Sequence, residues 1–163
     1  MTLNLIWSQT SAGVLGGATG AAPWTLPEDV EHVRRLTAGC PVLLSRAAWD
    51  ALPGPLRPLP DPDTIVLTRD RAWSAAGVTV VADVDAALTA TAGRRTWVLG
   101  AGRDHPELLA LADRVEITEV DLDVPGDVVA PVLGHRVWSS VTQAWRVSSS
   151  GVQYRFASYL RAA

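Results

Sequence analysis

Short apolar runs alternate along the chain with segments in which apolar residues recur every three or four positions. The first pattern predicts β-strands and the second predicts amphipathic α-helices. The predicted strands cover residues 3–8, 41–45, 64–68, 78–82, 96–99, 114–122, 136–146 and 152–160. The predicted helices cover residues 27–37, 47–53, 83–91 and 104–112. Strands that alternate with helices are typical of an α/β domain built on a largely parallel sheet.

The end of the chain departs from this alternation. The last two predicted strands follow each other without a helix between them, which indicates a closing antiparallel hairpin. We therefore expect a single α/β domain over residues 1–163, with an eight-stranded, mostly parallel central sheet, an antiparallel C-terminal hairpin strand and about four helices. A chain of 163 residues can bury roughly 70% of its unfolded surface in one core, and no linker or repeat divides this one.

One acidic residue, Asp29, stands in the first turn of the first predicted helix. Pro27 opens that helix, and Val33 and Leu36 give it an apolar face that packs inward. A carboxylate half-buried beside Trp24 has its pKa raised by desolvation, which suits proton donation or a charge-assisted hydrogen bond to a cationic ring. Periodicity alone slightly favours a plainer role, in which Asp29 complements the helix dipole.

Composition excludes several classes of function. A net charge of −3 argues against a nucleic-acid partner, and no apolar stretch approaches the roughly 18 residues of a membrane helix. The N-terminal segment lacks the basic region and cleavage signal of an exported protein, so we expect a cytoplasmic protein. Cys40 is the single cysteine, and the 3 histidines are dispersed without ligand spacing, so we expect no metal site.

Several segments, taken in chain order, resemble the dihydrofolate reductase family, and its actinobacterial members in particular. The run Pro23-Trp24-x-Leu26-Pro27-x-Asp29 resembles the family's substrate-binding signature, and residues 5–9 with 13–16 resemble its first strand and loop. Further segments resemble later parts of the family pattern, at residues 49–53, 57–60, 65–69, 97–100, 116–121 and 154–159. The resemblance covers essentially the whole chain.

The resemblance implies NADPH-dependent reduction of 7,8-dihydrofolate to tetrahydrofolate, a reaction of one-carbon metabolism, by a monomeric enzyme of a family of antifolate targets. It implies that Asp29 binds the pterin ring and promotes its protonation, that Thr118 supports Asp29, and that Trp24 anchors a mobile lid within residues 10–23. Residue type alone favours plainer roles, in which Thr118 fills space in a strand and Trp24 belongs to the core.

The resemblance also assigns the substrate side, where most residues form an apolar slot around the pterin and benzoyl rings. The expected residues are Ile6, Trp7, Asp29, Val33, Leu52, Leu56, Arg57, Leu99 and His105. Apolar residues at strand and helix ends are usually only core, so this assignment depends on the resemblance. Val33 replaces the Phe that is usual in the family, which removes an aromatic contact of about 1 kcal/mol.

For NADPH, the resemblance assigns residues on the loops that follow several predicted strands. They are Ser8, Leu15, Gly20, Arg46, Ala47, Ala48, Thr68, Arg69, Gly100, Ala101, Gly102, Arg103 and Asp104. Among them, Arg46, Thr68 and Arg69 match the family's clamp on the adenosine 2′-phosphate, which favours NADPH over NADH. Either arginine taken singly is equally well explained as a solvated surface residue.

Departures from the family pattern cluster around the expected pyrophosphate site. Ala48 replaces the hydroxyl residue that donates to the pyrophosphate, and Ala101 replaces the second glycine of a Gly-Gly pair. Asp104, followed by Pro106 and Glu107, predicts an N-cap with a capping box, and its carboxylate would compete with a phosphate. These departures favour an alternative, a non-catalytic ligand-binding paralogue.

A further departure concerns the glutamate tail of the substrate. Asp61-Pro62 stands where the family has Gly-Arg, and that Arg normally pairs with the folate carboxylate. Losing the pair removes about 1.5–3 kcal/mol, and Arg57 is the candidate to replace it from a different angle. A second alternative is therefore a reductase of a glutamate-free pterin or a related heterocycle.

Overall fold

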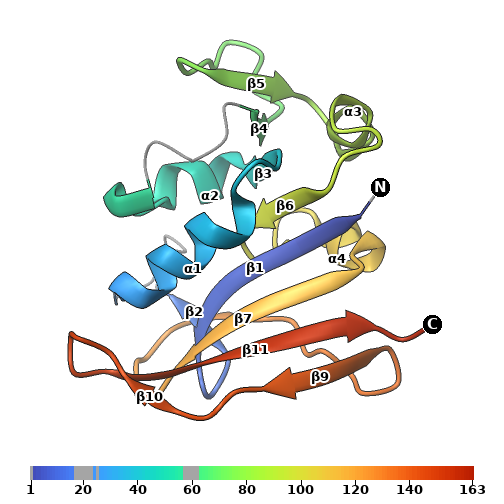
Figure 1. Cartoon of the computed structure of the whole chain (residues 1–163). Coiled ribbons are helices and arrows are strands. Elements are labelled where there is room, and N and C mark those ends of the chain that lie inside the picture. The colour runs from blue at the N-terminus through green and yellow to red at the C-terminus, as the bar shows by residue number, and fades with distance from the viewer. Residues whose placement is uncertain (1, 17–23, 25, 57–62) are drawn as a thin grey trace.

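The structure of the protein is a computed structural model that describes residues 2–16, 24, 26–56 and 63–163 (Figure 1). Two of the expected site residues, Gly20 and Arg57, lie outside the described residues. The Asp61-Pro62 pair and residues 17–23 of the expected lid also lie outside them.

One twisted sheet forms the centre of the molecule, in the order β10-β11-β7-β1-β6-β3-β4-β5, with β9 pairing with β11 as well. The strands are β1 (Leu3–Thr10), β3 (Val42–Ser45), β4 (Thr64–Leu67), β5 (Val78–Val81), β6 (Thr96–Leu99), β7 (Arg114–Val120), β9 (Trp138–Thr142), β10 (Arg146–Val147) and β11 (Gln153–Arg161). Across the sheet, the neighbouring strands β5, β4, β3, β6, β1 and β7 all pair in parallel. The C-terminal strand β11 pairs antiparallel to β7. The predicted α/β class and the mostly parallel sheet with an antiparallel C-terminal strand are confirmed.

Two details of the predicted strands differ. The predicted strand 136–146 is divided into β9 and β10, which pair with different stretches of β11, so the sheet is eight strands wide along its main path. A small separate sheet of β2 (Val14–Gly16) and β8 (Val128–Val129) was not predicted. Strands this short contain too few residues to show an alternating pattern.

The helices are α1 (Pro27–Thr37), α2 (Arg46–Ala51), α3 (Val84–Ala90) and α4 (Pro106–Leu111), with a 3-10 turn, η1 (Gly54–Leu56). The predicted helix 47–53 therefore starts one residue earlier and ends at Ala51. The chain continues from Leu52 as extended backbone and then as η1, because Pro53 and Pro55 offer no N–H to an α-helix.

The helices cover both faces of the sheet (Figure 1). Val33 of α1 packs with Val42, Leu44 and Trp97 on one face. Residues of α3 and α4 pack on the other face against Leu5, Leu43 and Val115. The sheet is thus buried on both sides over its central parallel strands β1, β3, β4 and β6, as expected for this class.

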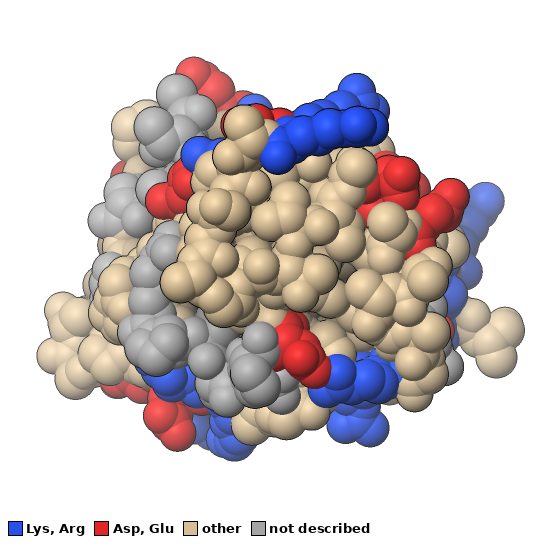
Figure 2. All heavy atoms as spheres, turned by 90° about the horizontal axis from the view of Figure 1, so that it is seen from above, with Lys and Arg blue, Asp and Glu red and all other residues tan. Residues whose placement is uncertain are grey.

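No described helix combines the length and the apolar character that crossing a bilayer requires. On the face seen from above in Figure 2, basic and acidic side chains both lie around an uncharged centre. Charge of one sign does not gather over that face.

Candidate active site

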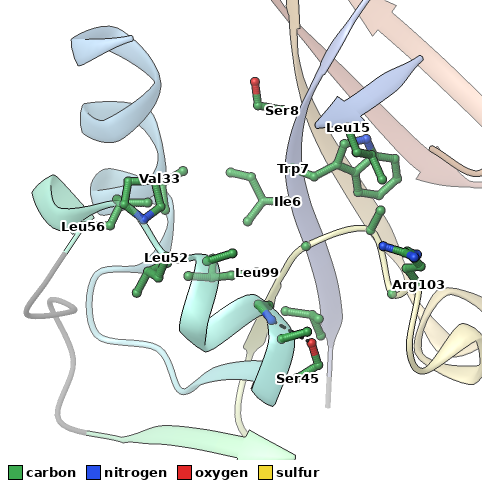
Figure 3. A pocket seen from close by; sticks show the side chains of 18 of the residues that line it. Ile6, Trp7, Ser8, Leu15, Val33, Ser45, Leu52, Leu56, Leu99 and Arg103 are labelled. Carbon is green, nitrogen blue, oxygen red and sulfur yellow. Dashed lines mark hydrogen bonds between the residues drawn. The ribbon is translucent and has the colours of Figure 1, made fainter. Parts of the chain in front are cut away.

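A cavity of about 240 Å³ opens at the carboxyl ends of β1, β3 and β6. Ligands of open α/β sheets bind at this end of the strands. The cavity is bounded by α1, α2, η1 and the loop that follows β6 (Figure 3). Most of the expected site residues line it: Ile6, Trp7, Ser8, Leu15, Trp24, Asp29, Val33, Ala47, Ala48, Leu52, Leu56, Leu99, Gly100, Ala101, Gly102, Arg103, Asp104 and His105.

Asp29 reaches the cavity from the first turn of α1, as the sequence predicts. Pro27 starts the helix, and the backbone N–H of Asp29 donates to Leu26 O at 3.1 Å. The hydroxyl of Thr118, on β7, donates a hydrogen bond of 2.6 Å to Asp29 Oδ1. The predicted pairing of these two side chains is therefore present.

Burial raises the pKa of Asp29 above its ordinary value, while the hydrogen bond from Thr118 and the charge of His32 offset part of that rise. A carboxyl with a raised pKa keeps its proton to higher pH than an exposed aspartate does. Asp29 is thus suited either to hold a proton or to bind N–H groups as a carboxylate.

Trp24 is both a core residue and a cavity residue. Its ring packs with Leu26, Val120 and Tyr154, and 9% of its surface remains exposed. Its indole Nε1–H donates to Ser8 Oγ at 2.8 Å. This bond fixes the residue just before α1 to the end of β1, so both the core role and the site role suggested by the sequence are compatible with the structure.

The apolar wall of the cavity comes from two directions. Figure 3 shows Val33, Leu52 and Leu56 grouped on the helical side, with Ile6 of β1 facing them. These four residues and Leu99 belong to one packed cluster. Trp7 points to the other side of β1, because successive strand residues alternate, and its Nε1–H donates to Gln9 Oε1 at 2.7 Å (Figure 3).

The loop after β6 turns tightly at two glycines. Gly100 has a φ of +118° and Gly102 a φ of +68°, conformations that residues with a β-carbon rarely adopt. A β-carbon on Gly102 would meet His105 O at 3.4 Å and Leu5 Cδ2 at 3.5 Å. The backbone N–H of Gly100 donates to Ile6 O at 2.9 Å, which holds the loop against β1.

The predicted N-cap at Asp104 is wrong. The helix α4 begins at Pro106, its N-cap is His105, and the cap side chain forms no hydrogen bond to the helix. Pro106 decides the boundary, because proline is favoured at the first helical position and keeps the residue before it out of the helix. Asp104 therefore lies one residue before the cap, exposed at the cavity rim.

A second hollow, of about 540 Å³, lies at the ends of β3 and β4. It brings together the three residues expected to bind the 2′-phosphate, Arg46, Thr68 and Arg69. The two hollows share Ser45, Ala47, Asp104 and His105, so they are adjacent. A ligand long enough to occupy both would run across the N-terminus of α2.

Arg46 has other contacts in this structure. Its Nε donates to Asp50 at 2.9 Å, one turn later on α2, and its guanidinium lies 4.6 Å from the centre of the Trp73 ring. These two contacts orient the Arg46 side chain. Because both are partly exposed and therefore weak, a bound anion can replace them as the partner of the guanidinium.

Three residues in or beside the site were not predicted: Ser45, Trp73 and His32. Ser45 lines both hollows and caps α2, accepting the Ala48 N–H at 3.1 Å. A hydroxyl residue between an apolar run and a helix-forming run usually indicates an N-cap, so the sequence contained a signal for Ser45. Trp73 and His32 gave no signal, because their contacts depend on the tertiary structure.

Comparison with known proteins gives a consistent family. A sequence model described as dihydrofolate reductase matches residues 2–161. A dihydrofolate reductase of Mycobacterium tuberculosis is 43% identical over 162 residues, which are 98% of this chain and 98% of the relative. Another, from Mycobacterium leprae, is 40% identical over 163 residues with the same coverage of both chains.

The fold comparison agrees. The solved structure of dihydrofolate reductase from Enterococcus faecalis, complexed with NADP(H) and RAB-propyl, has a TM-score of 0.84 to this chain at 29% identity. The similarity covers 99% of this chain and 97% of that one. Both comparisons therefore span all the elements that build the two hollows.

Proposed function

Because the chain belongs to the dihydrofolate reductase family, we propose that it reduces 7,8-dihydrofolate to tetrahydrofolate with NADPH. One observation carries the proposal at the level of side chains. Asp29 reaches an apolar cavity at the carboxyl ends of the strands, its carboxyl is largely desolvated, and Thr118 holds it at 2.6 Å. A carboxyl in such surroundings can bind the amino and ring N–H groups of a pterin.

In this proposal, Asp29 binds and orients the pterin and promotes protonation of the ring nitrogen next to the reduced carbon. Thr118 keeps one carboxyl oxygen in place, which leaves the other oxygen for the substrate. Ile6, Val33 and Leu99 exclude water from the ring faces, which strengthens the hydrogen bonds to Asp29. NADPH, when bound, supplies the hydride.

The residues of the two hollows fit such a cofactor. Gly100 and Gly102 both have a positive φ and present backbone without side chains beside α2. A β-carbon on Gly100 would lie 3.9 Å from Ala48 Cβ. We propose that Gly100, Ala101 and Gly102 line the path of the pyrophosphate, with Arg103 as the nearby cation. Ala48 and Asp104 weaken this part of the site, since one lacks a hydroxyl and the other is an anion.

We propose that Arg46, Thr68 and Arg69 bind the 2′-phosphate that distinguishes NADPH from NADH. Two guanidinium groups and a hydroxyl around one hollow are a suitable donor set for a dianion. Ser8, Leu15 and Ala47 line the neighbouring cavity and are the proposed contacts for the remainder of the cofactor. His105, at the start of α4, is proposed to contact the substrate side.

A second candidate substrate is a dihydropterin without a glutamate tail. Asp61-Pro62, in place of the usual Gly-Arg, favours it, because the chain then lacks the usual arginine for the tail carboxylate. Asp29 and the apolar slot would serve both substrates, since they contact only the ring.

We further propose that residues 1–163 act as one monomeric domain in the cytoplasm.

The test follows the absorbance of NADPH with dihydrofolate and, in parallel, with a dihydropterin that lacks the glutamate. Oxidation with dihydrofolate supports the first proposal, and oxidation with the tailless pterin alone supports the second. No oxidation with either, together with no NADPH-induced rise in melting temperature, would overturn both and leave a non-catalytic paralogue.

A further inference from the structure

A second group of ionisable side chains is buried directly behind Asp29. His32 lies one turn after Asp29 on α1, and 7% of its surface is exposed. Glu116 lies on β7, two residues before Thr118, and only 1% of its surface is exposed. His32 Nε2 is 3.7 Å from Glu116 Oε2. Neither side chain lines the cavity, so neither is expected to contact the substrate.

The contacts of His32 fix its ring. Arg35 Nη2 lies 3.0 Å from His32 Nδ1, and because a guanidinium only donates, Nδ1 accepts and the proton of the neutral ring is on Nε2. The ring stacks on Phe156 of β11, with 3.9 Å between ring centres and 15° between planes. Nε2 is buried without a hydrogen-bond partner among the described residues and points towards Glu116.

The contacts of Glu116 favour its ionised form. Burial by itself would raise its pKa, but the contacts with His32, Ser158 and Arg114 together hold the pKa below its usual value. Ser158 Oγ donates at 2.9 Å and Arg114 Nε at 2.6 Å. The side chain of Arg114 is 39% exposed, so water screens its charge more than that of Glu116.

The strand geometry connects this group to Asp29. Glu116 and Thr118 alternate with Ile117, so both side chains face α1, and Thr118 carries the hydrogen bond to Asp29. Two residues along a strand span roughly 7 Å, a distance over which buried charges still interact. Asp29 is therefore close to the buried carboxylate of Glu116 and to the imidazole that faces it.

The other elements packed against Asp29 and His32 contribute little charge on this side. From β11 they present Phe156 and Ser158, which are uncharged. On α1, Arg35 is exposed, and the carboxylate of Glu28 is bound by Ser148 and Ser149, at 2.7 Å and 2.9 Å. Apart from the phenol of Tyr154 on β11, which is 5% exposed and packs on Phe156, His32 and Glu116 are therefore the ionisable groups buried beside Asp29 on this face among the described residues.

We propose that His32 and Glu116 are positioning residues that set the pH range over which Asp29 holds its proton. The inference rests on the proposed role of Asp29. The negative charge of Glu116 favours the protonated form of Asp29. His32 turns its Nε2–H towards Glu116, which offsets part of that charge and favours the ionised form of Asp29. The two side chains act in opposite directions, and the balance between them sets the proton affinity of Asp29 without either touching the substrate.

The experiment compares the pH dependence of turnover with NADPH and dihydrofolate in the wild type and in variants of the pair. His32→Gln removes the imidazole, and His32→Phe removes it while retaining an aromatic stack on Phe156. In both, the midpoint of the pH profile should move to higher pH by about 0.5 unit. Glu116→Gln should move it to lower pH by a similar amount, and the double variant should lie between the single variants.

The matched control is Glu119→Gln. Glu119 is on the same strand and also pairs with an arginine, Arg155, at 2.6 Å, but it points to the opposite face of the sheet. Its profile should keep the wild-type midpoint. Melting temperatures identify any variant that does not fold, and the two His32 substitutions decide the matter if Glu116→Gln fails to fold.

Three outcomes are distinguishable. Midpoints displaced in opposite directions by the His32 and Glu116 variants support the inference. An active wild type whose variants lose rate equally at every pH, with unmoved midpoints, would overturn it and leave the pair purely structural. A wild type that oxidises no NADPH with dihydrofolate would instead overturn the proposed function itself.

Discussion

Thr118 Oγ1 lies 2.6 Å from Asp29 Oδ1, across 89 residues of sequence. This bond joins the first turn of α1 to β7 at the cavity, and it orients the one carboxyl that we place on the substrate. We expect Thr118→Val, which keeps the shape and removes the hydroxyl, to lower turnover about 10–100-fold, as the loss of a hydrogen bond to a charged group predicts.

The same variant should also alter the pH profile. Because the Thr118 hydrogen bond lowers the pKa of Asp29, its removal should move the profile to higher pH. Thr79→Val, on the exposed face of the outer strand β5, is the matched control and should behave as the wild type. Steady-state kinetics from pH 5 to 9 measure both effects; equal rates in the two variants would mean that the hydroxyl has no part in the reaction.

The burial of Asp29 should also affect the stability of the fold. The pKa of Asp29 is raised on folding, so the folded protein binds more protons than the unfolded chain, and stability is lost as the pH rises from the ordinary value of 3.8 through the folded value. Asp29→Asn removes this cost and should be more stable than the wild type at pH 7.

Urea unfolding at several pH values measures the effect. The difference between Asp29→Asn and the wild type should shrink as the pH falls towards 3.8, where the aspartate becomes protonated in both states. A variant that is less stable at pH 7 would show that the charged form of Asp29 contributes to the fold.

Restoring a hydroxyl at position 48 should strengthen cofactor binding. Ala48 lies beside the Gly100 turn, where a β-carbon on Gly100 would come within 3.9 Å of it. Ala48→Thr should improve the affinity for NADPH by up to about tenfold, the effect of one hydrogen bond to a charged group. Fluorescence titration with NADPH measures this, with Ala86→Thr on the exposed side of α3 as the control; weaker binding in Ala48→Thr would exclude the proposed pyrophosphate path.

Cofactor preference should depend on Arg69. Arg69→Gln removes one guanidinium from the proposed 2′-phosphate site, so the affinity for NADPH should fall about 10–100-fold while that for NADH stays nearly unchanged. Arg71→Gln is the matched control, because Arg71 is also exposed and lies two residues further along. Equal losses for both cofactors would place the 2′-phosphate elsewhere.

The sequence was sufficient for the layout of the fold, because its central parallel strands are buried on both faces and its helices have one apolar face. The strand 3–8 and the helix 27–37 are found at β1 and α1 within two residues. The two helix boundaries that failed depend on proline. Pro53 ends the second helix early, and Pro106 moves the start of α4 beyond Asp104.

The site was predictable only in part. The pairing of Asp29 with Thr118 came from the family resemblance, since periodicity places each residue on its own element but not against the other. The contact of His32 with Glu116 gave no local signal, because it requires the packing of α1 against β7. The stacking of Arg46 on Trp73 likewise depends on a loop that follows β4.

The most direct test of the account is the reaction of Asp29→Asn with NADPH and dihydrofolate, measured beside its affinity for NADPH. Because the amide cannot take part in proton transfer, turnover should fall at least about 100-fold. The affinity for NADPH should stay within roughly twofold of the wild type, since the cofactor residues lie elsewhere in the two hollows. Turnover close to that of the wild type, or an equal loss of turnover and NADPH binding, would contradict the role given to Asp29.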